Sequence, residues 1–199
     1  MMRKILIVPA LFLVASCYNL KKGTRPVYFS ADSTVFADSL FPEQAVYFND
    51  FYGIMGNHYE DVELRKDEVV KGFALGTTLI GIDRDKALIY PKEHILVKGS
   101  YDDYHFTAVN GSEQRNRELM VFKVFKKLEK QPVLPQLTDY TLQSVLDLEQ
   151  QQKEEIAKAE ARSQLLFDSL LNAYAVSKKF KELTKGYISN RYDFSLIWI

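Results

Sequence analysis

The spacing of apolar residues changes near Asn110, and this change constrains the fold more than any other feature of the 199-residue chain. Residues 27–110 contain short runs of β-branched and aromatic residues separated by turn-forming residues, a pattern typical of β-strands. Seven of the nine glycines fall between Gly53 and Gly111, where the turns of such a sheet are expected. Beyond Asn110 the period becomes helical, so the sequence predicts an α+β fold: an N-terminal antiparallel β-sheet or sandwich, then helices.

The strands are expected to pair as hairpins. The clearest hairpin is "TTLIGIDRDKALIY", residues 77–90, with its turn around residues 83–85. A second is formed by "HILVKG" and "YHFTAV", residues 94–99 and 104–109, with a turn from Ser100 to Asp103. Further strands are predicted within "QAVYFNDFYGIM" and "YEDVELR".

The segment "NGSEQRNRELMVFKVFKKLEK", residues 110–130, predicts an amphipathic helix that packs on the sheet. Asn110 is the expected N-cap, since Glu113 follows three residues later. Lysines face away from an apolar stripe made by Leu119, Phe122, Phe125 and Leu128. Pro132 and Pro135 end this helix and open a connector.

A longer helical segment is expected over residues 138–185. Its apolar residues recur at broadly helical spacing: Leu142, Val145, Ile156, Leu166, Leu170, Tyr174 and Leu183. The middle, "EQQQKEEIAKAEARSQ", can bury only Ile156 and some alanines, which predicts either a solvated, projecting helix or a helix pair with a break. The apolar tail, "GYISNRYDFSLIWI", either docks into the fold or leads toward a further domain.

The N-terminus has the features of a secretory signal. Arg3 and Lys4 precede an apolar run over residues 5–15, which is about half the roughly 20 residues that a membrane-spanning helix needs. The string "VASC" that follows resembles the lipobox of bacterial lipoproteins, in which small residues precede a lipid-modified cysteine. This resemblance implies that Cys17 carries acyl chains and attaches the protein to the bacterial cell envelope, on the periplasmic face of the inner or outer membrane. An ordinary signal peptide with a chance cysteine, or a buried free thiol, is the alternative.

These features divide the chain into a lipoprotein signal peptide (1–16), a lipidated tether (17–26), a β-rich domain with its closing helix (27–131), and a helical neck with an apolar tail (136–199). Removing residues 1–16 takes two basic side chains from the 26 present and none of the 26 acidic ones, leaving a formal net charge of −2. This balance offers no electrostatic footprint for nucleic acid.

The sequence holds no recognisable catalytic or metal-binding motif. Cys17 is the single cysteine, which excludes a redox Cys-x-x-Cys pair, a disulfide and a cysteine zinc site. The three histidines, His58, His94 and His105, lie too far apart along the chain to form a paired ligand motif, and are expected on the surface or on strand faces. Asp102 and Asp103 offer adjacent carboxylates, a pair more typical of a turn than of a catalytic or calcium site. We therefore expect no catalytic residue, metal or cofactor.

The block "IYPKEHILVKGSYDDYHFTAVNGSEQRNRELMVF", residues 89–122, resembles the N-terminal domain of thioredoxin-like, TlpA-type lipoproteins of Gram-negative envelopes. The resemblance implies a β-rich domain, a polar "NGS" turn, a helix and a helical neck that leads to a thioredoxin domain. That domain's Cys-x-x-Cys motif has no counterpart in this chain, so reductase activity cannot be carried over.

Two classes of function remain after these exclusions. The first is a noncatalytic envelope lipoprotein that acts as an accessory module and binds a protein partner through its helical segment, or a truncated thioredoxin-like lipoprotein. The second is a cysteine-independent envelope hydrolase that would use carboxylates and a histidine, for which Asp102, Asp103 and His105 are the candidates.

Overall fold

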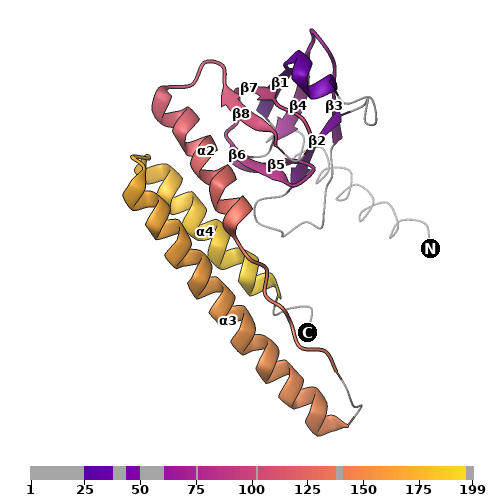
Figure 1. The fold of residues 1–199 in the computed structure, drawn as a ribbon, viewed down its shortest axis with the longest axis vertical. Helices are drawn as coiled ribbons and strands as arrows, with labels where there is room; N and C mark the ends of the chain where they lie inside the picture. Colours follow the sequence, from indigo (N-terminus) through magenta and orange to yellow (C-terminus); the bar gives the residue numbers. More distant parts are fainter. Residues whose placement is uncertain are drawn as a thin grey trace, which may run out of the picture.

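The chain folds as two small β-sheets followed by helices, which confirms the predicted α+β class (Figure 1). The computed structural model describes residues 25–37, 44–49, 61–74, 76–101, 103–137 and 141–195. The signal peptide, Cys17, His58 and Asp102 therefore lie outside the described residues, as do most of the tether and the last residues of the apolar tail.

Sheet A has the strand order β4-β1-β7-β8. Its strands are β1 (Arg25–Ala31), β4 (Val69–Ala74), β7 (His94–Lys98) and β8 (His105–Ala108). β1 pairs antiparallel with β4 but parallel with β7, so the sheet is mixed and not wholly antiparallel. The predicted pairing of residues 94–99 with 104–109 is confirmed as the antiparallel β7–β8 pair.

Sheet B has the order β3-β2-β5-β6, and all of its pairs are antiparallel. Its strands are β2 (Gln44–Asn49), β3 (Asp61–Leu64), β5 (Thr78–Ile82) and β6 (Asp85–Ile89). The predicted hairpin of residues 77–90 is confirmed: Ile82 pairs with Asp85 across a two-residue turn at Asp83 and Arg84. Asp83 has φ 49°, the left-handed geometry that such tight turns require.

The inner faces of the two sheets form one apolar core. Phe29 of β1 meets Phe48 of β2 edge to face, with ring centroids 5.6 Å apart. Gly72 leaves room for this contact, since a Cβ there would lie 2.6 Å from the Phe48 ring. A short 3-10 helix, η1 (Ser33–Phe36), adds Val35 to the same core.

Helix α2 (Glu113–Leu128) packs against β6 and β8. Its N-cap is Ser112, whose Oγ accepts a hydrogen bond from the backbone N–H of Arg115 at 3.1 Å, so the prediction of Asn110 was wrong. Asn110 lies in the turn that follows β8 and is too early to cap. The prediction that Leu128 belongs to the stripe that packs on the sheet was also wrong. Leu128 is 54% exposed, because the helix ends there and the chain leaves the sheet.

The predicted helical segment is a pair of antiparallel helices, α3 (Leu142–Ala173) and α4 (Lys178–Ser195), with the break at residues 174–177 (Figure 1). Phe167 of α3 lies at the centre of a second core, 5.6 Å from the Phe125 ring of α2 and 6.1 Å from the Phe180 ring of α4. Within the ranges that the structure describes, none of the helices combines the length and apolar character needed to span a bilayer.

The apolar residues that recur at helical spacing along the helical segment are buried only in part. Ile156 is 2% exposed and packs in the second core, whereas Leu142 is 77% exposed and Val145 lies on the surface. Leu142 and Val145 are exposed because the described part of α4 ends at Ser195, before it reaches them.

Candidate functional site

The histidines with described positions lie on sheet A but are not brought together. His94 Nε2 is 2.9 Å from Ser30 Oγ, and His105 lies at the opposite end of the β7–β8 pair, opposite Lys98. No group of three potential metal ligands occurs anywhere in the described ranges. The two histidines therefore do not define a metal centre between them.

Asp103 and His105 form a contact with a lysine of α2. His105 Nε2 is 3.3 Å from Asp103 Oδ2, and Lys123 Nζ donates to Asp103 Oδ1 at 2.8 Å. The hydrogen bond from Lys123 is the largest cause that lowers the pKa of the Asp103 carboxyl below its ordinary value, and His105 adds a smaller contribution. Asp103 and His105 are each about 60% exposed, so the cluster lies on the open surface.

The side chain of Lys123 is itself only 10% exposed and lies between β6 and the turn before β8. Its Nζ is 3.7 Å from Asp85 Oδ1, and Asp85 Oδ2 accepts a hydrogen bond from the backbone N–H of Tyr104 at 2.7 Å. The sequence analysis placed the lysines of this helix on its exposed side, which is wrong for Lys123. Because the lysine joins the turn before β8 to both β6 and α2, the cluster stabilises the packing of the helix on the sheets.

Arg115 at the start of α2 makes the most extensive buried ion pair. Its Nε and Nη2 donate to the two carboxylate oxygens of Glu93, at 2.6 Å and 2.9 Å, and Nη2 also donates to the carbonyl oxygen of Leu88 at 2.6 Å. The guanidinium lies over the Tyr90 ring, 4.2 Å from its centroid. This arrangement fixes α2 to the segment that connects β6 with β7.

The same cluster continues into the helical hairpin. Glu118, which is 3% exposed, accepts from Arg115 Nη1 at 3.4 Å and from the backbone N–H of Ser177 at 2.9 Å. Lys179 of α4 lies over the Tyr90 ring at 4.1 Å. We call Glu93, Arg115, Glu118 and Ser177 the joint, since they connect the β-domain to the break between α3 and α4.

Tyr90 is packed into this joint. Burial is the largest cause that raises the pKa of its phenol to about 12. Its hydroxyl has no hydrogen-bond partner among the described residues. The aromatic ring therefore serves the joint mainly as a surface for the two cations.

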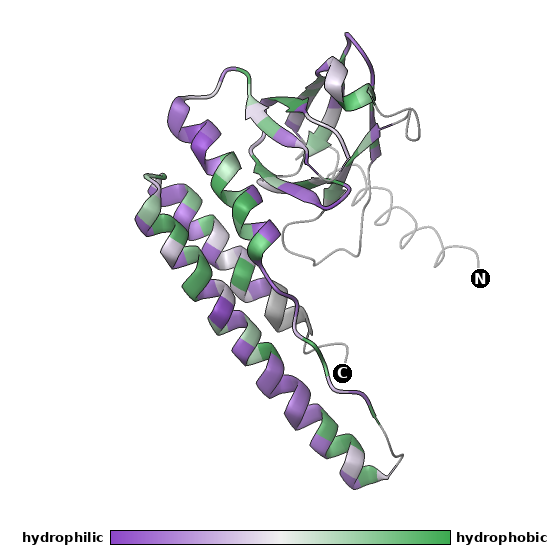
Figure 2. Cartoon of the chain, in the orientation of Figure 1, coloured by the Kyte–Doolittle hydropathy of each residue, from purple (hydrophilic) through white to green (hydrophobic). Residues whose placement is uncertain are grey.

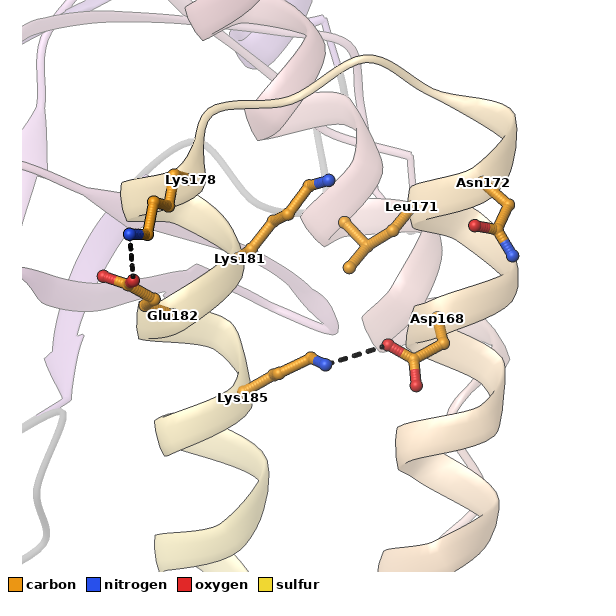
Figure 3. A pocket seen from close by; sticks show the side chains of 7 residues that line it. All are labelled: Asp168, Leu171, Asn172, Lys178, Lys181, Glu182 and Lys185. Carbon is orange, nitrogen blue, oxygen red and sulfur yellow. Dashed lines mark ion pairs between the residues drawn. The ribbon is translucent and has the colours of Figure 1, made fainter.

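An open groove of about 510 Å³ runs between α3 and α4 (Figure 3). Four of its charged side chains form two ion pairs: Lys185 Nζ lies 3.3 Å from Asp168 Oδ1, and Lys178 Nζ lies 3.7 Å from Glu182 Oε1. The residues that line it include no histidine, serine or cysteine. The groove therefore offers no nucleophile with an activating base.

The N-terminal end of α3 extends beyond α4. The Asp168–Lys185 pair sets the antiparallel register, so Ser195, ten residues after Lys185, lies roughly level with Lys158, ten residues before Asp168. Residues 142–149 therefore lie beyond the described end of α4, which reaches only to about the level of Lys158. Three apolar side chains are exposed there, and we call them the uncovered end of α3: Leu142, Val145 and Leu146.

These three residues lie close to the face of α3 that is buried farther along the helix. Spacings of three and four residues lead from Val145 through Leu148, Gln152 and Ile156 into the second core. The connector after α2 covers one side of this stretch, where Gln152 Nε2 donates to the Pro135 carbonyl oxygen at 3.0 Å. Figure 2 shows apolar segments at this lower end of α3.

Comparison with known proteins identifies no relative: no family model, curated protein or solved structure matches the chain. The joint, which the sequence analysis missed, therefore has to be interpreted from its own geometry. The sequence did contain a signal for the joint, because Arg115 and Glu118 lie on the same helical stripe as Leu119 and Phe122. Charged residues in an otherwise apolar stripe indicate a buried ion pair.

Proposed function

We propose that the protein is a lipid-anchored, noncatalytic accessory module of the bacterial envelope that binds a protein partner through the uncovered end of α3. The partner contributes an amphipathic helix that continues the path of α4 along α3. The observation that carries this proposal is the exposure of Leu142, Val145 and Leu146 near the face of α3 that is buried farther along the helix.

Three features support a helix as the bound element. The uncovered end lies near the same face of α3 that α4 covers farther along, so a second helix can pack there with similar geometry. The exposed residues follow helical spacing, as in helix-in-groove recognition. The joint holds the hairpin to the β-domain through partly buried hydrogen bonds, which favour a fixed orientation of the surface.

The anchor in this proposal is Cys17. Its position after a short signal-like segment, in a string that resembles a lipobox, supports lipid modification. Two acyl chains, at about 0.8 kcal/mol for each buried methylene, hold a protein firmly on a bilayer. Attachment restricts diffusion to the membrane surface, which favours partners held on the same membrane.

The hydrolase alternative has less support. The contact between Asp103 and His105 unites two of its three candidate residues, and the third, Asp102, lies outside the described residues. Because both members of the contact are largely exposed to water, they lack the desolvated setting that tunes catalytic groups.

The test is affinity capture from detergent-solubilised membranes with the full chain as bait. Replacement of Leu142, Val145 and Leu146 by lysine puts charge on the uncovered end, and we expect at least about a tenfold loss of the captured partner. Leu165→Lys is the matched control, because Leu165 is 71% exposed on the same helix but lies on its opposite face. Equal recovery with both variants, or no protein captured above background by the unmodified chain, would refute the proposal.

A further inference from the structure

The outer face of sheet A carries no carboxylate on its strands. Alternation places every second residue on this face, as the register and burial show. The residues on it are Pro26, Tyr28 and Ser30 of β1, Val69, Lys71 and Phe73 of β4, His94, Leu96 and Lys98 of β7, and His105 and Thr107 of β8. This face is therefore apolar, aromatic and basic.

The outer face of sheet B differs in both charge and cover. Leu79 and Leu88 on that face belong to the second core, because α2 packs over them. The uncovered edge strand β3 presents Asp61 and Glu63 to solvent. Among the described elements only the outer face of sheet A is both open and free of acidic strand residues, and Phe73 is 42% exposed on it.

Two acidic groups at the border of this face are held by partners on α2, whereas Asp32, which follows β1, lies near enough to Lys98 for that lysine to contribute to its lowered pKa. Glu93 is held by Arg115 in the joint, and Asp103 accepts a hydrogen bond from Lys123. By contrast, Lys71 and Lys98 form no ion pair within 4.0 Å in the described part of the chain. The Lys71 ammonium lies 4.8 Å from the Phe73 ring centroid, so basic and aromatic groups are adjacent.

The chain enters this same sheet from its predicted anchor. Only the seven residues 18–24 separate Cys17 from Arg25, where β1 begins, and the eight Cα–Cα steps between these two residues span at most about 29 Å. β1 is an inner strand of sheet A (Figure 1). We propose that the outer face of sheet A lies against an anionic lipid bilayer, with Lys71 and Lys98 at the headgroups and Tyr28 and Phe73 at the interface.

This inference rests on the proposed lipid anchor and adds an orientation to it. Each basic residue near an anionic surface favours binding by about fivefold, which is too little to hold a protein alone but enough to orient one already attached. Aromatic side chains prefer the same interfacial layer. With this face on the lipid, the protein has one membrane-contacting side, and the uncovered end of α3 remains a separate surface for its partner.

The test uses the full chain purified from cells with its acyl groups. The chain is placed on vesicles of phosphatidylcholine alone, or of equal parts phosphatidylcholine and phosphatidylglycerol, and lysine acetylation is followed residue by residue by mass spectrometry. We expect Lys71 and Lys98 to react at least about fivefold more slowly on the anionic vesicles. Lys127 and Lys130, exposed at the end of α2, should react equally on both.

A paired set of variants tests the same face by hydroxyl-radical labelling of Phe73. Lys71→Glu with Lys98→Glu should abolish the protection of Phe73 on anionic vesicles, and Lys127→Glu with Lys130→Glu should leave it intact.

Three outcomes separate the orientation from the anchor. An acylated chain in which Lys71 and Lys98 react equally on both kinds of vesicle would overturn the orientation and leave the anchor standing. Protection that rises with protein concentration on both vesicles would indicate a second copy on this face and also overturn it. Protection of Lys71 and Lys98 on a chain that carries no acyl groups would support the contact between this face and the membrane and refute the lipid anchor.

Discussion

The two ends of α3 belong to one continuous helix, yet only one of them is packed. The C-terminal part buries Ile156, Ala159 and Phe167 against α2 and α4. The N-terminal end leaves Leu142, Val145 and Leu146 in contact with solvent. Both parts have apolar residues at helical spacing, so the difference comes from the partners that the fold supplies and not from the helix itself.

This difference separates the part of α3 that stabilises the fold from the part that we propose as a binding surface. Burial of large side chains between three helices, together with the joint, holds the hairpin in place. The exposed apolar end contributes little to folding stability, and for this reason we propose it as the surface for a partner. Pairs of substitutions, one at a buried and one at an exposed position, should separate the two roles.

The largest effect is expected at the centre of the second core. Phe167→Ala removes a fully buried ring that contacts Phe125 and Phe180, and we expect the free energy of unfolding to fall by about 3–5 kcal/mol. Leu142→Ala at the uncovered end should change it by less than about 0.5 kcal/mol. Urea unfolding followed by circular dichroism measures both values, and similar losses in the two variants would contradict the comparison.

The next largest loss of stability is expected where a buried ion pair is broken. Arg115→Met leaves the carboxylates of Glu93 and Glu118 without their guanidinium, and we expect a loss of about 3 kcal/mol, since breaking a buried pair strands the remaining charge. Arg117→Met breaks a pair with the exposed Glu113 and should cost less than about 1 kcal/mol. Should urea unfolding rank the two variants in the reverse order, the joint would not be a source of stability.

The smallest effect is a pH dependence at Asp103. Lys123 lowers the folded pKa of this carboxyl below its ordinary 3.8, so its contribution is present above about pH 4 and is lost as the pH falls through the lower, folded value. Because Asp103 is largely exposed, the contribution should stay within about 0.5 kcal/mol. Stability measured on acidification should fall slightly less in Asp103→Asn than in the unmodified chain. Asp67→Asn, at an exposed turn, is the control, and identical slopes for all three proteins would exclude the contribution.

Much of the architecture could be predicted from the residue pattern, because alternation and helical spacing are local properties. The hairpin of residues 77–90, the β7–β8 pair and the existence of α2 all follow from neighbours in sequence. The N-cap of α2 does not follow from its neighbours in sequence. Asn110 and Ser112 both suit the role, and the turn after β8 decides between them. The parallel β1–β7 pair was also missed, since strands separated by more than 60 residues leave no local signal of direction.

The sequence by itself determined the α+β order of elements, the absence of reactive cysteine pairs and the candidacy of Cys17 as an anchor. Tertiary structure decided which charged residues are buried: Arg115 meets Glu93 and Glu118, and through Glu118 reaches the break between α3 and α4. It also decided that one face of sheet A stays open while α2 covers part of sheet B. The physical reason is that propensity and periodicity act over a few residues, whereas burial depends on which distant segments meet.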